Sequence, residues 1–266
     1  MFNLIKMNLY RMVHAVSTWV LAIVAVFLAF LDFGIMKIMV DDPFKLFGSA
    51  SSQMLGTTTI TGRTTIAGFL ISSDILIVLS IFVVIFANAE QKNGFDKNII
   101  GITKMKWKHT VARWLSCVIG LTAIVAVSYG LYFGLSALFM NSFAMGSVAA
   151  YLKVLATVYF GLVAFSAIFF FFTTLFRSSV GGIVASLVMS LGVLSLLEKL
   201  LDFAVKKIFT SPKILPTDLL FDSAYINFDA TSATTKACLI MAGISLAYIV
   251  LSVGGSALLQ QKRDVK

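Results

Sequence analysis

Charged residues are scarce in this chain. Asp, Glu, Lys and Arg together make up 12% of the 266 residues, whereas soluble domains carry about 25%. Apolar residues reach 59%, and the mean hydropathy is +0.96. The shortage of charge excludes an ordinary soluble domain and indicates a membrane protein.

Cysteine and histidine are also scarce, with only Cys117, Cys238, His14 and His109. We expect the two cysteines to lie about 20 Å apart in depth, because a membrane span crosses about 30 Å of hydrocarbon. A disulfide needs Cα atoms within about 7 Å, so none is predicted. Neither histidine has the spacing of a zinc ligand, and no H-E-x-x-H or G-x-S-x-G motif occurs. The sequence predicts no metal site and no enzymatic activity in the chain alone.

Six apolar runs are long enough to cross a bilayer, which takes about 20 residues. They predict an all-α, polytopic membrane protein whose residues 1–266 form a single transmembrane domain. The predicted transmembrane helices cover residues 15–36, 69–88, 112–139, 151–175, 179–201 and 237–259. We expect a multi-pass protein of a cell membrane, most simply a bacterial cytoplasmic membrane.

The distribution of basic residues predicts that both termini are cytoplasmic. In that orientation the cytoplasmic segments hold twelve basic and three acidic residues, and the other nine of each sign cancel. The formal net charge of +9 then lies entirely on the cytoplasmic face, as the positive-inside rule expects. No basic segment is interleaved with exposed stacking aromatics, so no nucleic acid is expected as a partner.

Residues 1–14 predict an amphipathic helix that lies in the cytoplasmic interface, in contact with membrane lipids. The apolar residues Phe2, Ile5, Leu9, Met12 and Val13 share one helical face, and the polar residues fall mostly elsewhere. The alternative is that this segment is only the start of the first transmembrane helix.

The longest cytoplasmic connection, residues 89–111, is too charged to enter lipid. Gly94 interrupts it, and Phe95, Ile99 and Ile102 are spaced to give a short helix an apolar stripe. Two interpretations stay open. The segment is either a solvated basic loop that only sets the topology or a surface that docks a cytoplasmic partner.

Residues 202–236 predict an extracellular helical excursion. An apolar stripe continues into it from the fifth span until Pro212 breaks the helix. Its carboxylates have no histidine or second acidic cluster near them, so they predict no metal site. They are Asp218, Asp222 and Asp229.

Small and polar residues within the spans are candidates for a transport path. Asp74, beside Ser73 in span two, either lines a polar path or pairs with a cation on a neighbouring helix. The acid of span five, Glu198, lies near an outer end, where it can reach water.

Span five also carries a small residue at every fourth position, which permits close helix packing within the chain or in a dimer. This stripe consists of Gly182, Ser186 and Ser190. Six phenylalanines crowd span four and predict packing or lipid contact, with an aromatic substrate surface as the alternative. They are Phe165, Phe169, Phe170, Phe171, Phe172 and Phe176.

The order of these segments, with two short motifs, resembles a known family. The motifs are the stretch from Glu90 to Gly94 that leads into Lys97-Asn98-Ile99-Ile100, and the end Gln261-Lys262-Arg263-Asp264. With the amphipathic start, the six spans and the extracellular excursion, the layout is similar to the membrane-spanning permease subunit of type-two ATP-binding-cassette (ABC) exporters. Small bacterial permeases of peptide or antibiotic export and immunity are the most similar members. The resemblance covers the whole chain in architecture, although its motifs are short and degenerate.

This resemblance implies that residues 1–14 match an interfacial connecting helix and that residues 89–101 match a coupling helix. A coupling helix docks into a separate ATPase, and the residues implied here are Glu90, Lys92, Gly94, Phe95, Lys97, Asn98 and Ile99. It also implies that spans two and five line the route. The candidates there are Ser73, Asp74, Gly182, Ser186 and Ser190.

The implied assembly has two permease halves, identical or different, and two cytoplasmic ATPase subunits. ATP and Mg²⁺ are then bound by the partner, and no cofactor is expected in this chain, which has no Walker A motif. The implied function is ATP-driven export of an amphipathic peptide, antibiotic or lipid-like compound. Two alternatives stay open: a secondary carrier or channel, which predicts buried ion-coupling residues or an inverted repeat, and a scaffold or sensor that transports nothing.

Overall fold

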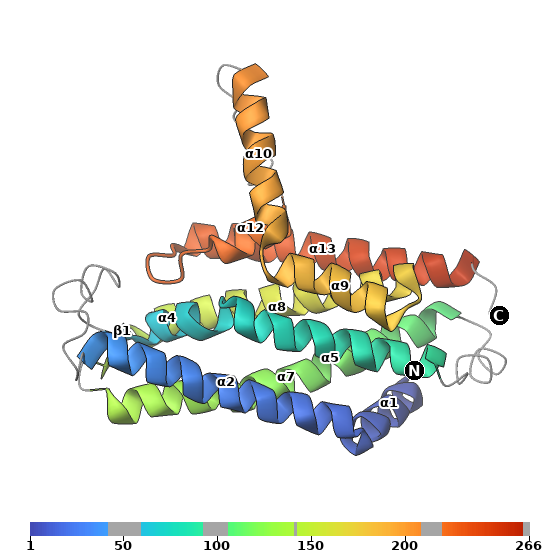
Figure 1. Cartoon of the computed structure of the whole chain (residues 1–266), viewed down its shortest axis with the longest axis horizontal. Helices are drawn as coiled ribbons and strands as arrows, with labels where there is room; N and C mark the ends of the chain where they lie inside the picture. The colour runs from blue at the N-terminus through green and yellow to red at the C-terminus, as the bar shows by residue number, and fades with distance from the viewer. Residues whose placement is uncertain (42–59, 93–105, 141–142, 209–219, 263–266) are drawn as a thin grey trace.

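The structure, a computed structural model, describes residues 1–41, 60–92, 106–140, 143–208 and 220–262. These residues are nearly all helical. Figure 1 shows the long helices lying side by side in one bundle, with α1 and the last turns of α13 at the same end. We call this the terminal end of the bundle.

Nine helices of six or more residues form the described part of the chain. They are α1 (Phe2–His14), α2 (Val16–Asp41), α5 (Ser73–Lys92), α7 (Lys106–Phe139), α8 (Val148–Phe176), α9 (Ser179–Ser190), α10 (Val193–Ile208), α12 (Phe221–Ile226) and α13 (Thr235–Lys262). A short helix α4 (Gly62–Thr65) and a π-helical turn η1 (Ile66–Leu70) precede α5.

Four helices, α2, α7, α8 and α13, are each long and apolar enough to cross a membrane. Two bent pairs, α4–η1 with α5 and α9 with α10, raise the number to six if each pair is one span. The chain is therefore a multi-pass, helical membrane protein with four to six crossings. The predicted spans 15–36, 151–175 and 237–259 fall within α2, α8 and α13, apart from one residue at the start of the first.

The helix at predicted span three begins earlier than expected. Residues 106–111 were expected in a loop, but α7 starts at Lys106. Its first turns are held by buried contacts, since Thr110 donates its hydroxyl proton to Gln260 of α13 and Arg113 stacks 5.1 Å from the Phe170 ring. These tertiary contacts extend the helix past its apolar part.

The fifth predicted span, 179–201, is two helices rather than one. α9 and α10 meet at an angle of 57°, and α10 projects away from the bundle (Figure 1). Gly192 forms the turn with φ of +68°, a conformation that residues with a Cβ rarely adopt. The expected boundary between a span and an extracellular excursion at residue 202 thus falls inside α10.

Span two is also broken, because α4–η1 (Gly62–Leu70) and α5 are inclined at 51° to one another across Ile71 and Ser72. The break leaves carbonyl groups without helical partners, which is costly in lipid. The Ser72 hydroxyl donates to the Phe69 carbonyl (2.7 Å). The Tyr225 hydroxyl donates to the Leu70 carbonyl (2.9 Å). α12 therefore closes a break that lies 155 residues away in the sequence.

Helix α8 is the most buried of the long helices and packs most extensively on α13. Gly161 lets α12 approach it closely, because a Cβ at this position would lie 2.4 Å from the Tyr225 ring. Phe165, one turn later, packs against Phe221 at 4.8 Å and Tyr225 at 5.1 Å between ring centroids. The core of the bundle is built around this contact.

Polar and apolar side chains are distributed as expected for a protein in lipid. Exposed apolar residues such as Trp19, Ile23 and Phe27 cover the outer face of α2. Buried hydroxyls inside the bundle donate to their own helix, as Ser116 does to the Ala112 carbonyl (2.9 Å). Within lipid, polar groups must find partners inside the protein.

Helix α1 is separate from α2, since Ala15 between them is extended (φ −80°, ψ 122°). The Trp19 indole donates to the Val13 carbonyl (2.8 Å) and caps the end of α1. The alternative that residues 1–14 merely begin the first span therefore does not hold.

The predicted apolar face of α1 is only partly packed. Ile5 and Leu9 are half-buried, whereas Phe2 and Val13 are exposed. Met12 is the buried member of this face: its sulfur would lie 2.4 Å from a Cβ at Gly120 of α7, the helix that α1 contacts most. The exposed apolar side chains remain for contact with lipid.

A small β-bridge departs from the all-α prediction. β1 (Ile60–Thr61) pairs in parallel with β2 (Phe143–Ala144), with Ile60 opposite Phe143.

The turn before α13 is held by polar contacts. The Arg63 guanidinium donates to the Thr231 carbonyl (3.0 Å). Asp229 accepts hydrogen bonds from the side chains of Ser232 and Thr231, and these lower the pKa of Asp229 to about 2. This carboxylate stabilises its own turn.

We expect Gly161→Ala to destabilise the protein by about 1–3 kcal/mol, the range typical of overpacked interiors. The added methyl group must displace the Tyr225 ring, and α12 with it. Gly130→Ala is the matched control, because nothing lies within 4 Å of a Cβ at that position of α7. Thermal unfolding in a neutral detergent measures both variants. Equal melting temperatures would show that α12 does not pack on Gly161.

Candidate functional site

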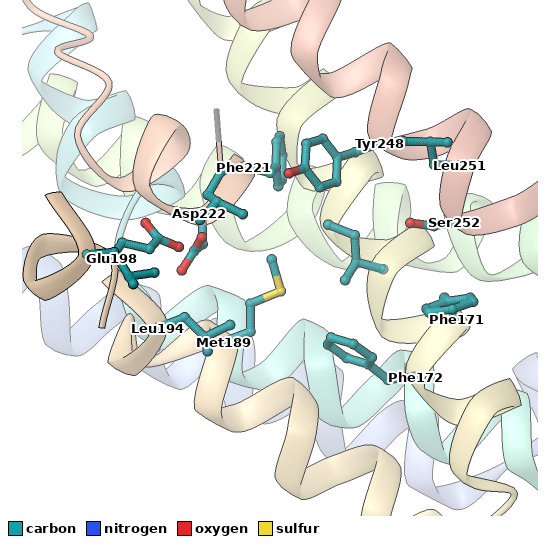
Figure 2. Close-up of a pocket in the computed structure, with 13 residues that line it drawn as sticks. Phe171, Phe172, Met189, Leu194, Glu198, Phe221, Asp222, Tyr248, Leu251 and Ser252 are labelled. Carbon is teal, nitrogen blue, oxygen red and sulfur yellow. The ribbon is translucent and has the colours of Figure 1, made fainter. Parts of the chain in front are cut away.

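A cavity of about 530 Å³ lies between α8, α9, α10, α12 and α13. Figure 2 shows the residues that line it. They are Ile168, Phe171, Phe172, Met189, Leu194, Glu198, Leu201, Leu220, Phe221, Asp222, Tyr248, Leu251 and Ser252. Cavities of this size are typical of small-molecule sites.

The cavity lies at the depth of the bilayer interior. Tyr248 precedes the end of α13 by 14 residues, which corresponds to about 20 Å of helix, and the hydrocarbon core is about 30 Å thick. The walls are mostly apolar and aromatic. Phe171 and Phe172 come from α8, Tyr248 and Leu251 from α13, and Met189 from the last turn of α9 (Figure 2).

Two carboxyl groups stand at one end of this apolar cavity. Glu198 of α10 is 4% exposed and Asp222 of α12 is 2% exposed. Figure 2 shows the two carboxyl groups facing one another. The Ser223 hydroxyl donates to Glu198 Oε2. Asp222 Oδ2 has no hydrogen-bond partner among the described residues.

This arrangement is electrostatically costly unless something else is bound. Two adjacent carboxylates in a buried place repel one another, and each also loses its hydration. No lysine or arginine is among the described residues that line the cavity. The pair can therefore hold a proton between the two groups, or it can hold a cation.

The five predicted pathway residues lie outside the cavity. Ser73 and Asp74 begin α5 and are exposed. The other three are buried where α9 packs on α5 and α8. Ser190 donates to the Ser186 carbonyl (2.8 Å) and the Leu76 carbonyl (3.3 Å). A Cβ at Gly182 would lie 3.0 Å from Val84.

The small-residue stripe of span five thus serves packing within the chain. Of the two interpretations left open by its spacing, the structure shows the intrachain one. The structure does not bring Asp74 and Ser73 to the cavity, although Asp74 lies close enough to Asp32 for their charges to interact.

The phenylalanines of span four divide into three groups. Phe165, Phe169 and Phe170 are fully buried and pack the bundle. Phe171 and Phe172 line the cavity, and the aromatic substrate surface stays a prediction. The last of the six, Phe176, is half exposed.

The residues implied for ATPase docking are mostly outside the described residues. Glu90 and Lys92 lie in the last turn of α5, at the terminal end of the bundle. Gly94, Phe95, Lys97, Asn98 and Ile99 fall in 93–105, which the structure does not describe. Their docking role stays a prediction.

The two carboxyl groups of the cavity were missed by sequence reasoning. Glu198 was expected to reach water, and Asp222 was expected in an acidic extracellular loop. One sequence signal was available, since Glu198 and Asp202 are four positions apart and so share one side of α10. The structure buries both, while Leu200, Leu201 and Phe203 are exposed. A helix that exposes its apolar side and buries its acids is typical of a lipid environment.

Within the described ranges, no three His, Cys, Asp or Glu side chains are grouped so as to hold a metal ion. Comparisons of the chain with protein-family models, with curated proteins and with solved structures gave no match. The inference of function therefore depends on the chemistry of the cavity and on the layout of the sequence.

We expect Asp222→Asn to stabilise the ligand-free protein by about 1 kcal/mol at pH 8, where ordinary carboxyl groups are ionised. The substitution keeps the shape of the side chain and removes one of two adjacent buried charges. Binding sites commonly cost stability in this way.

The matched control is Asp74→Asn, which removes the same charge at an exposed position and should leave the melting temperature within one degree or so. Thermal unfolding in neutral detergent makes the comparison. A lower melting temperature for Asp222→Asn than for the control would show that the carboxylate stabilises the fold.

Proposed function

We propose that this chain is the permease half of an ATP-driven exporter of amphipathic compounds, with ATP hydrolysed by a separate cytoplasmic subunit. The observation that carries the proposal is the cavity, which lies among the membrane-crossing helices and is bordered by the broken pair α9–α10. Broken helices beside a mid-membrane cavity are a common feature of transporters. The ATPase partner follows from the resemblance of the sequence layout to exporter permeases.

The charge distribution supports a cytoplasmic location for the terminal end of the bundle. Lys6 and Arg11 of α1, Lys106 and Lys108 of α7, and Arg177 after α8 all lie there. Cytoplasmic ends of membrane helices are rich in such residues. In this orientation the end of α5, at Lys92, lies on the side of the membrane that contains ATP.

The packing of α5 on α9 offers a route from the end of α5 to the cavity. Asn88, near the end of α5, donates to the Ser179 hydroxyl at the start of α9 (2.5 Å). The two helices then pack along the small-residue stripe of α9. The far end of α9 carries Met189, a wall of the cavity. A movement imposed at the end of α5 therefore reaches the cavity through a rigid helix pair.

A second candidate function is supported by a different observation. A secondary carrier needs buried groups that bind and release a coupling ion, and the Glu198–Asp222 pair is buried inside the bundle. In this alternative, transport follows a proton or cation gradient and needs no ATPase.

The first experiment is affinity purification of the chain from native membranes in mild detergent, with identification of its partners and reconstitution into vesicles. We expect a partner with a Walker A motif, transport that requires ATP, and a loss of ATP-driven transport of about tenfold or more in Glu90→Ala with assembly intact. Asp229→Ala, at the opposite end of the bundle, is the control. A chain that purifies alone and transports along an imposed pH gradient would establish the carrier instead.

The Asn88–Ser179 contact gives a more specific prediction. Asn88→Leu keeps the size of the side chain and removes the hydrogen bond to Ser179, so we expect ATP hydrolysis to proceed while transport per ATP falls several-fold. Ser72→Ala is the control, since Ser72 bonds only within its own turn. The ratio of substrate moved to phosphate released is the measurement. An unchanged ratio would exclude this contact from the coupling route.

A further inference from the structure

The polar and apolar residues that line the cavity lie at different ends of it. The Glu198 and Asp222 carboxyl groups meet at one end, and the rings of Phe171 and Phe172 lie toward the other (Figure 2). The distribution matches a ligand with a charged group at one end and an apolar body.

The carboxyl end calls for a positively charged group. Asp222 Oδ2 is buried and has no hydrogen-bond partner among the described residues, and no basic residue of the described chain lines the cavity. Buried charges are stable only when they are paired. A cation that enters the cavity supplies the missing partner and relieves the repulsion between the two carboxyl groups.

The apolar walls do not suit a divalent metal ion. Ca²⁺ and Mg²⁺ take about six or more oxygen ligands, including water, and Glu198 and Asp222 supply the only carboxyl groups among the described residues that line the cavity. Aromatic rings attract organic cations through their faces, and four rings line the cavity, those of Phe171, Phe172, Phe221 and Tyr248. The chemistry favours a cation that is largely hydrocarbon.

The opening of the cavity faces the lipid. Leu251 on α13 is 69% exposed and Leu201 on α10 is 54% exposed, and both border the cavity. Exposed leucines on membrane helices contact acyl chains. A ligand that dissolves in the bilayer can therefore reach the carboxyl pair without crossing water.

We propose that this cavity binds an amphipathic organic cation from the bilayer, with its positive group between Glu198 and Asp222 and its apolar body against Phe171 and Phe172. This inference rests on the proposed transport function in one respect, namely that the bound cation is the cargo. The binding itself requires neither ATP nor a partner subunit.

The test uses tetraphenylphosphonium and tetraphenylborate, two ions of the same shape and opposite charge. Equilibrium dialysis measures their binding to the full purified chain in a neutral maltoside detergent. We expect the cation to bind about tenfold or more tightly than the anion. Equal binding of the two ions, or no binding of the cation to the folded chain, would overturn the proposal.

Isosteric variants locate the site. Glu198→Gln and Asp222→Asn each should weaken binding of the cation by about tenfold or more and reduce the preference over the anion. Asp229→Asn, in the turn before α13, should leave binding unchanged. Ser252→Phe fills the apolar end and should weaken both ions, and a thermal melt confirms that each variant is folded. Cation binding that survives the double variant Glu198→Gln, Asp222→Asn would place the ligand elsewhere.

A lipid with an amine headgroup and a soluble amphipathic cation share this chemistry. Competition by phosphatidylethanolamine, but not by phosphatidylglycerol, identifies a lipid as a ligand of the site. An absence of competition by both lipids identifies a non-lipid cation, and both results support the site.

Failure of the inference differs from failure of the proposed function. If the cation binds selectively but is not transported in an ATP-driven way, the binding site is supported and the exporter function is contradicted. If the protein transports other compounds with ATP and shows no preference for the cation, the exporter function is supported and the cation site is contradicted.

Discussion

The contact between the Tyr225 ring and Gly161 is the interaction on which the rest of the bundle depends. Gly161 has no side chain, so α12 crosses α8 at a distance that no other residue permits. From this position Tyr225 satisfies the Leu70 carbonyl at the break in span two. The same placement brings Asp222 to Glu198 and Phe221 to within 5.4 Å of Tyr248, between ring centroids. The cavity exists because α12 is held here.

Lipid explains why the two breaks need partners from elsewhere in the chain. Outside a membrane, water would bond to the carbonyl groups that a broken helix exposes, whereas hydrocarbon cannot. Side chains of the bundle supply these hydrogen bonds. At the first break the Tyr225 hydroxyl donates to the Leu70 carbonyl, and at the second the Ser195 hydroxyl donates to the Gly192 carbonyl. The Ser190 hydroxyl, at the end of α9, donates to the Leu76 carbonyl in the first turns of α5, so the two breaks lie beside one another.

The proposed functions divide along the length of α9. Its first residues meet the end of α5, where an ATPase would act in the exporter interpretation, and its last turn borders the cavity. The carrier alternative needs only the cavity end, with the carboxyl pair as the coupling site. In the exporter interpretation, α9 therefore connects the ATPase side to the ligand cavity. In the carrier interpretation, the same helix has only a structural role. The difference is functional and requires no difference in fold.

Sequence patterns alone determined the helical, multi-pass character of the chain, because long apolar runs with few charges have no stable alternative to membrane helices. They also indicated the separate α1, since its apolar residues recur with helical spacing. The patterns did not locate the break at Gly192. Glycine is tolerated within membrane helices, and only the packing of α10 and α12 shows that this one turns the chain.

The candidate site depended on tertiary structure for a related reason. Glu198 and Asp222 are 24 positions apart in the sequence, and each by itself has the pattern of an acid near water. Their meeting depends on the bend between α9 and α10 and on Tyr225 against Gly161. Local pattern thus determined which segments enter the membrane, because transfer into lipid is a property of each segment. Which polar groups face one another inside was decided by packing between distant segments, which no local pattern contains.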